Sequence, residues 1–404
     1  MKILHTADWH IGKTLYKQEL NEQIRLFFEW LIGVIQSEKV DVLLVSGDIF
    51  DLANPSNADK KMYYRMLHRL NALSITCIIT AGNHDSPSLI EGPKDLLDEL
   101  DIHVIGHGSP IERQLMCVTS SDGEKAHFLA VPFLRPGDID MKQSGLSYTD
   151  KVSSLRDGIV AHYQSLFQMA QDQDSSLPVL AMGHLYIQGV SLASKRSERD
   201  IHIGNLAGLS VDSLDGMFDY IALGHIHRPQ QLNKSGTIRY AGSPVALSFS
   251  ERKDEKQVIL IDVVAGTIAD IRPMPVPIFR SLSRVSGTLI EVKESLKAYR
   301  SNGKLSSYIE IIVKEAIRNE SIILETIALA ELSSPHYKII NHKIQFLESS
   351  TPLSDQVMAE DIEDLKPRDV FLQRIKHESL SREDLESLTE AFDEVYAATL
   401  IDGI

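Results

Sequence analysis

The stretch Val42-Leu43-Leu44-Val45-Ser46-Gly47-Asp48 runs from four apolar residues through two small residues to a carboxylate. A short apolar run that ends at a glycine is typical of a β-strand buried on both faces. Four other stretches end in the same way, with an apolar run, a small residue and then polar side chains: Ile3–His10, Cys77–Asp85, Val179–His184 and Tyr220–His227. The sequence therefore predicts five buried strands, each followed by a polar group.

Polar side chains at five strand ends indicate one shared site. Ligands of open α/β sheets bind beyond the carboxyl ends of the strands, so we expect the five ends to meet at one rim. The rim would carry Asp8, His10, Asp48, Asn83, His184, His225 and His227. Oxygen and imidazole ligands suit Mn²⁺, Fe or Zn²⁺ better than Ca²⁺, which prefers oxygen alone. Seven ligands divide naturally between two ions bridged by one carboxylate, and the small residue before each ligand would allow close approach.

The charge of such a site differs from the charge of the chain. With 56 acidic and 41 basic residues among 404, the formal net charge is −15, which argues against a protein that holds nucleic acid by its own basic surface. Two divalent ions, two aspartates and a bound hydroxide would leave the site at about +1, which favours a phosphodiester anion. Residues 355–404 hold 14 acidic and 5 basic side chains, so we expect a solvated or protein-binding segment there.

The pattern of apolar residues predicts the fold class and three parts of the chain. Residues 1–272 alternate short apolar runs with amphipathic stretches, which predicts an α/β fold with two packed mixed β-sheets flanked by helices. Closely spaced prolines between Pro273 and Pro277 favour a boundary there, because proline cannot continue a helix or a central strand. Residues 280–345, with strands at Tyr308–Val313 and His336–Asn341, would form a small α+β capping domain. Residues 350–404 would form a C-terminal helical segment.

Several classes of protein are excluded at this stage. Apolar runs such as Val42–Val45 fall far short of the roughly 20 residues that cross a bilayer, so a membrane-spanning protein is not expected. The N-terminus enters a strand-like stretch without the features of a secretory signal, and the cytoplasm is the expected location. The two cysteines, Cys77 and Cys117, offer neither a disulfide framework nor a thiolate zinc site.

The five stretches together resemble a known family. Asp8-x-His10, Gly47-Asp48, Gly82-Asn83-His84-Asp85, Gly183-His184 and Gly224-His225-Ile226-His227 stand in the order seen in calcineurin-like metallophosphoesterases. Within that superfamily the chain is similar to the SbcD family, the nuclease subunits of bacterial SbcCD complexes. The closer resemblance rests on Met1–Gly12, Gly47–Asp51, Val131–Pro136, Asp219–Arg228 and Tyr240–Pro244, and it covers about the first 270 residues well.

The resemblance implies a role for each residue of the site. Asp8, His10, Asp48 and His227 would hold one ion, and Asp48, Asn83, His184 and His225 would hold the other, with Asp48 as the bridge. His84 and Asp85 would be catalytic, His84 as a residue that contacts the scissile phosphate without binding metal and Asp85 as its orienting partner. Some relatives carry a histidine where Asp51 stands here, which leaves the role of Asp51 open.

The resemblance also implies a reaction and partners. Mn²⁺ would be the working ion of a double-strand exonuclease and hairpin or single-strand endonuclease in DNA repair, recombination and replication. The partner would be a coiled-coil ATPase that docks on the C-terminal helices, and the chain would form a homodimer within a heterotetramer. The expected docking face consists of Val370, Phe371, Ile375, Leu385, Leu388 and Phe392.

Two other functions stay open at the level of sequence. The same ligands would serve a phosphatase or phosphodiesterase acting on another phosphoester, because a fold and its reaction centre do not fix the substrate. A non-enzymatic scaffold could keep the fold and lose the metals, but all seven expected ligands are present.

Overall fold

The computed structural model describes residues 1–139, 148–187, 208–332 and 334–346, and in the C-terminal region Phe371, Leu388, Thr389, Ala391 and Phe392. The chain divides into two units, one of residues 1–315 and 319–345 and one of residues 316–318 and 346–404. Among the residues described, no helix combines the length and the apolar character that a membrane span requires.

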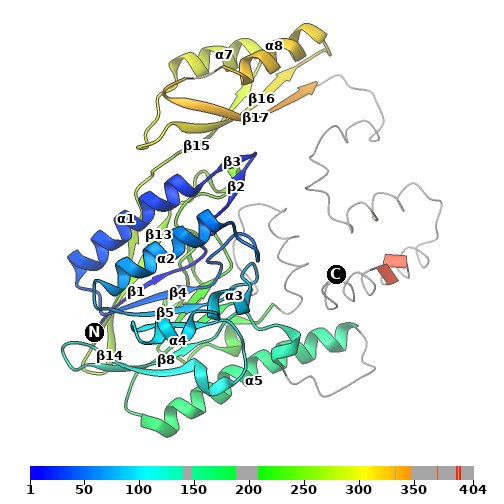
Figure 1. Ribbon diagram of the computed structural model, residues 1–404. Helices are drawn as coiled ribbons and strands as arrows, with labels where there is room; N and C mark the ends of the chain where they lie inside the picture. The colour runs from blue at the N-terminus through cyan, green and yellow to red at the C-terminus, as the bar shows by residue number, and fades with distance from the viewer. Residues whose placement is uncertain are drawn as a thin grey trace. The chain divides into compact units, whose positions relative to one another are not determined.

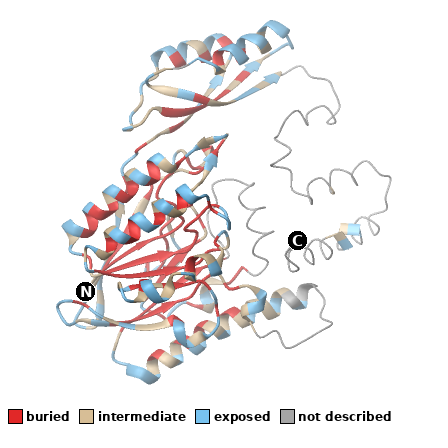
Figure 2. Ribbon diagram, in the orientation of Figure 1, coloured by how far each residue is buried: buried red, intermediate tan, exposed pale blue. Residues whose placement is uncertain are grey.

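The first sheet has six strands in the order β14-β13-β1-β4-β5-β6 (Figure 1). Their bounds are β1 Lys2–Thr6, β4 Val42–Ser46, β5 Thr76–Thr80, β6 Ile102–Ile105, β13 Gln257–Val264 and β14 Thr267–Pro275. Strands β1, β4, β5 and β6 run parallel, while β13 and β14 pair antiparallel beside them. Every residue of β4 and β5 is buried, as expected for strands covered on both faces (Figure 2).

The second sheet also has six strands, in the order β11-β12-β10-β9-β8-β7. Their bounds are β7 Leu115–Thr119, β8 Lys125–Ala130, β9 Val179–His184, β10 Tyr220–Gly224, β11 Gln230–Gln231 and β12 Ile238–Tyr240. Strands β8, β9, β10 and β12 are parallel. The two mixed sheets confirm the predicted fold class for this part of the chain.

The two sheets pack face to face, with helices on their outer sides. Side chains of β1, β4 and β5 such as Leu44 and Ile78 share a buried cluster with Leu180 and Ala222 of the second sheet. On the opposite face, Leu43 and its neighbours pack against α1 (Asn21–Glu38) and α2 (Asn57–Asn71). Helix α5 (Tyr148–Asp174) covers the outer face of the second sheet. The site described below therefore sits on a rigid, densely packed support.

Short elements connect these layers. A small hairpin joins β2 (Thr14–Leu15) to β3 (Gln18–Glu19). The other short elements are α3 Pro87–Glu91, α4 Lys94–Asp98 and the 3₁₀ turns η1 Ile111–Gln114, η2 Pro136–Asp138, η3 Val211–Ser213 and η4 Phe249–Glu251.

The proline-rich stretch behaves differently from the sequence expectation. Strand β14 continues through Pro273 to Pro275, three residues beyond the predicted end of the first domain. It can do so because β14 is the edge strand of its sheet. A proline nitrogen that faces away from the one neighbouring strand costs the sheet no hydrogen bond. The boundary at residue 272 stays a proposal.

A three-stranded sheet follows, in the order β15-β16-β17. Its elements are β15 Leu282–Gly287, α7 Leu289–Ala298, β16 Ser307–Glu315, α8 Glu320–Ala330 and β17 Tyr337–Phe346. Helices α7 and α8 and the sheet share a small core with Val292, Ile311 and Leu329. The sequence predicted strands at the positions of β16 and β17 but not β15, whose residues LSRVSG are mostly polar or small.

The predicted C-terminal helical segment lies mostly outside the described residues. This holds for Val370, Ile375 and Leu385 of the expected docking face. Among the residues described there, the rings of Phe371 and Phe392 stack with centroids 4.2 Å apart and an interplanar angle of 10°. The segment therefore remains a proposal.

Candidate metal centre

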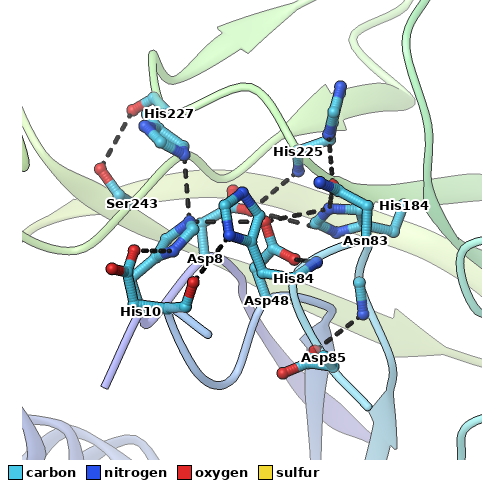
Figure 3. A network of polar contacts seen from close by, with 12 residues as sticks. Asp8, His10, Asp48, Asn83, His84, Asp85, His184, His225, His227 and Ser243 are labelled. Carbon is cyan, nitrogen blue, oxygen red and sulfur yellow. Dashed lines mark hydrogen bonds and ion pairs between the residues drawn. The ribbon is translucent and has the colours of Figure 1, made fainter. Parts of the chain in front are cut away.

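The seven predicted ligands come together at the carboxyl ends of β1, β4, β5, β9 and β10 (Figure 3). The sequence predicted one rim, and the structure divides its five strands between two facing sheets, three in the first and two in the second. The two halves are joined directly, because the Ser46 hydroxyl donates to the Ala222 carbonyl at 2.9 Å.

Four of these residues have a left-handed backbone. The φ angles are 53° at Asp8, 45° at His10, 51° at Asp48 and 98° at His225. Residues other than glycine rarely adopt positive φ, and such strained positions gather at functional sites. The backbone turns sharply just past each strand, which directs these side chains inward.

The glycines before the ligands leave room for that turn. A Cβ at Gly82 would lie 2.0 Å from Oδ1 of Asp48, and one at Gly224 would lie 1.8 Å from the carbonyl oxygen of Ser46. At Gly47, where φ is +80°, a Cβ would lie 2.1 Å from Nδ1 of His184. The expectation that small residues allow close approach at this site is confirmed.

One oxygen of Asp48 lies between two groups of side chains. Its Oδ2 is 3.4 Å from Nε2 of His10 and 3.3 Å from Nε2 of His184. On the first side, Nε2 of His10 is 3.1 Å from Nε2 of His227. The nearby Asp8 carboxylate keeps Oδ2 buried and without a partner, while its Oδ1 accepts from the His225 amide at 2.8 Å.

The second side centres on Asn83. Its Oδ1 is 3.1 Å from Nε2 of His184 and 3.0 Å from Nδ1 of His225. The seven side chains thus lie together around Asp48, while the division of the ligands between two ions stays a proposal. Within the described residues, Asp8, His10 and His227 also bring ligand atoms within 4.8 Å of one another, as do Asp8, Asp48 and His184.

The pattern of lone pairs fits two cations. Nδ1 of His10 faces Oδ1 of Asp51 at 3.2 Å, and Nδ1 of His184 faces the Ser46 carbonyl at 2.9 Å. A ring that donates through Nδ1 presents a lone pair at Nε2. In the neutral rings these Nε2 atoms face oxygens of Asp48 and, for His184, also of Asn83, so each contact needs a positive charge, which a proton on the ring or a bound cation would supply. Imidazole, carboxylate and amide ligands are a set that Mn²⁺, Fe and Zn²⁺ accept.

The electrostatics of the site agree. Burial raises the pKa of Asp8 above its usual value, and the neighbouring charge of Asp48 acts in the same direction. Burial alone would lower the pKa of His184, but the charge of Asp48 and a hydrogen bond to it raise that pKa to about 9. The negative potential of the buried carboxylates therefore favours protonation of His184, and the same potential would favour a divalent cation.

Comparisons with known proteins decide the family. Residues 1–229 match the family description "Calcineurin-like phosphoesterase". The SbcD subunit of the SbcCD nuclease of Escherichia coli K12 is 30% identical, and the match covers 97% of each chain. The chain belongs to the SbcD family of calcineurin-like phosphoesterases. The SbcD subunit of Rhodobacter capsulatus is 34% identical over 73% of this chain and 75% of its own, and that of Bacillus subtilis is 35% identical over 66% of this chain and 67% of its own. Membership in the SbcD family makes the chain a metal-dependent phosphodiesterase.

The resemblance gives His84 a role on the substrate and not on a metal ion, and this role stays a proposal, since a ligand atom of His84 also lies within 4.8 Å of ligand atoms of His10 and Asp51. The backbone N–H of His84 donates to Oδ1 of Asp48 at 3.0 Å, and Nδ1 of its ring donates to the carbonyl of Asp51 at 2.8 Å. The side chain is exposed, and its ring meets that of His10 edge-on with centroids 5.0 Å apart. The ring of His84 can therefore be reached from solvent. The hydrogen bond to the Asp51 carbonyl uses Nδ1 and leaves Nε2 available for a substrate.

The structure corrects the role predicted for Asp85. The carboxylate of Asp85 accepts from the backbone N–H groups of Gly82 at 2.8 Å, Phe50 at 2.9 Å and Ile49 at 3.1 Å. The group that orients the His84 ring is the Asp51 carbonyl instead. Asp85 ties the loop after β4 to the loop after β5, and burial together with the charge of Asp48 raises its pKa to about 6.

Two functional side chains were missed or left open by the sequence. Asp51, whose role was open, accepts from Nδ1 of His10 and pairs with Lys13 at 3.1 Å; burial would raise its pKa, but these partners lower it to about 2. Glu251 stands behind His227, with Oε1 3.4 Å from Nδ1. Asp51 lies within the Gly47–Asp51 stretch that carried the resemblance, whereas nothing in the local sequence of Glu251 marks it.

Proposed function

We propose that this chain is the Mn²⁺-dependent DNA nuclease subunit of an ATP-dependent complex that processes DNA ends in the cytoplasm. The observation that carries the proposal is the Asp48 carboxylate between two groups of ligand atoms, in a chain that matches the SbcD subunit of an SbcCD nuclease over 97% of both lengths. The proposed activities are those of a double-strand exonuclease and a hairpin or single-strand endonuclease.

The proposal assigns the ligands in two sets. Asp8, His10, Asp48 and His227 would hold one ion, and Asp48, Asn83, His184 and His225 would hold the other. When bound, two divalent ions would activate water and neutralise charge on the phosphate oxygens. Because the chain is acidic overall, such ions would also supply the positive charge that a DNA backbone requires.

His84 would act on the substrate directly. The Asp51 carbonyl fixes the ring through Nδ1, which leaves Nε2 to contact the scissile phosphate and to transfer a proton to the leaving oxygen. Asp85 would contribute by holding the loop that carries Asn83 and His84. Neither residue needs to form a covalent bond to the substrate.

The partner is proposed to be an SbcC-like coiled-coil ATPase. Residues 350–404 would carry its docking face, and the stacked rings of Phe371 and Phe392 support an apolar contact surface in that segment. The active form would be a homodimer of this chain within a heterotetramer, with the ATPase bound to each copy.

Cleavage assays with three substrates test the function. The full chain with Mn²⁺ should cut a 5′-labelled hairpin and a duplex oligonucleotide, and should leave a phosphoserine peptide intact. Asp48→Asn is the matched inactive control, because it removes the shared charge and keeps the side-chain shape. Efficient hydrolysis of the phosphopeptide without DNA cleavage would contradict the nuclease proposal and favour a phosphatase.

A further inference from the structure

A buried ion pair lies directly behind His227. Nζ of Lys256 is 2.7 Å from Oε2 of Glu251, and the two side chains are 8% and 5% exposed. Glu251 ends η4, and Lys256 immediately precedes β13. Buried ion pairs contribute little to stability, since desolvation offsets their attraction. The pair therefore needs an explanation other than stability.

Lys256 uses all three of its N–H donors within this network. Besides Glu251, Nζ donates to Oγ of Ser243 at 2.9 Å and to the backbone carbonyl of His227 at 3.0 Å. Ser243 in turn lies beside His227, as Figure 3 shows. The lysine thus fixes the main chain at the residue that carries the proposed ligand.

Glu251 completes the arrangement from the side of the ring. Oε2 also accepts from the Leu247 amide at 3.2 Å, and Oε1 accepts from the Ser248 hydroxyl at 3.1 Å and from Nδ1 of His227 at 3.4 Å. A carboxylate opposite Nδ1 keeps the proton on that nitrogen and leaves the lone pair at Nε2. That Nε2 lies 3.1 Å from Nε2 of His10, where the first ion is proposed.

We propose that Glu251, held by Lys256, is a positioning residue that fixes the orientation and tautomer of His227 for metal binding. The inference rests on the proposed assignment of His227 as a ligand. Lys256 holds the main chain of His227 and Glu251 holds its ring, so the network acts on one proposed ion site and leaves the Asn83 side of the centre untouched.

The test measures Mn²⁺ binding to the full chain in two ways. Calorimetric titration gives the affinities, and the electron paramagnetic resonance spectrum reports whether the bound ions are coupled. The double variant Glu251→Gln with Lys256→Met removes both buried charges together, so neither is stranded. It should bind one Mn²⁺ about 10–100-fold more weakly than the wild type and the other with unchanged affinity. The resonance spectrum should then change from that of a coupled pair to that of a single ion at limiting Mn²⁺.

Two further variants keep the test decisive if the double variant folds poorly. Glu251→Asp keeps the negative charge beside Lys256, withdraws the carboxylate from Nδ1 of His227 and should weaken the binding of the same Mn²⁺. Glu310→Gln is the control. It removes the buried carboxylate that pairs with Arg284 in the three-stranded sheet, and it should leave both Mn²⁺ affinities unchanged.

The outcomes separate this inference from the function on which it rests. If the wild type binds two Mn²⁺ and both Glu251 variants bind them equally well, the positioning role is wrong and the metal centre stands. If His227→Ala binds two Mn²⁺ with wild-type affinity, the ligand assignment is wrong, and the inference is overturned with it.

Discussion

Gly82→Ala perturbs the shared carboxylate through a single methyl group. Gly82 has no positive φ, so alanine fits its backbone and the effect comes from contact alone. The new Cβ would lie 2.0 Å from Oδ1 and 2.3 Å from the backbone nitrogen of Asp48, whereas ordinary contact begins at 3.4 Å. The carboxylate or the β5 strand end must therefore move by about 1.4 Å, the difference between 3.4 and 2.0 Å. Asp48 cannot simply rotate away, because its Oδ1 also accepts from the His84 amide.

The expected cost falls mainly on activity. Overpacking of a core by one methyl costs about 1–3 kcal/mol, which a domain stable by roughly 5–15 kcal/mol survives. Misplacement of a catalytic group by about 1 Å lowers rates about 10²-fold. We expect Gly82→Ala to fold and to lose about 10²-fold or more in kcat/KM for Mn²⁺-dependent hydrolysis of bis(p-nitrophenyl) phosphate.

The control is the same substitution at Gly33, an exposed position of helix α1 where a Cβ would meet nothing within 4 Å. Gly33→Ala should leave the rate unchanged and stabilise the fold by up to about 1 kcal/mol. Thermal melts followed by circular dichroism check both variants. A folded Gly82→Ala protein with the wild-type rate would refute the view that the Asp48 carboxylate must stay where the structure places it.

Three other predictions follow from particular residues. His84→Ala should keep both Mn²⁺ ions in metal analysis and lose about 10²–10⁴-fold in cleavage rate, and loss of metal would contradict its role. Burial would raise the pKa of Glu91, but the Gly106 amide and His107 lower it below 4.5, so the ionised carboxylate stabilises the fold above pH 4.5 and this stabilisation is lost as the pH falls through the lower folded pKa. Glu91→Gln should therefore have a smaller free energy of unfolding in urea than the wild type at pH 7 and nearly the same one at pH 3. A difference in unfolding free energy that stays constant with pH would argue against this linkage. Deletion of residues 350–404 should abolish co-purification with the coiled-coil ATPase while hydrolysis of bis(p-nitrophenyl) phosphate continues; co-purification of the truncated chain would place the docking face elsewhere.

The strands that carry the site could be predicted because burial on both faces requires a continuous apolar run. The apolar residues at the start of the stretches Val42–Asp48 and Cys77–Asp85 lie within β4 and β5. The assembly of the ligands was predictable as well, since each run ends in a small residue and a polar group. The division between two sheets was not visible in those local patterns, because the pairing of strands depends on contacts between residues far apart in the chain.

The supporting side chains were harder to predict. Asp85 follows His84 directly, yet the ring of His84 is held by the carbonyl of Asp51, a backbone atom that carries no sequence signal. Glu251 reaches His227 across 24 residues, through a turn whose sequence is not distinctive. Strand β15 was missed because only one face of it is covered, and its polar residues hide the alternation.

Anomalous diffraction at the manganese absorption edge tests the central claim most directly. Crystals of the full chain grown with Mn²⁺ should show two peaks about 3.5–4 Å apart, with the Asp48 carboxylate between them. One peak should lie among Asp8, His10 and His227, and the other among Asn83, His184 and His225. A single peak at saturating Mn²⁺, or none at these side chains, would contradict a two-ion phosphodiesterase centre.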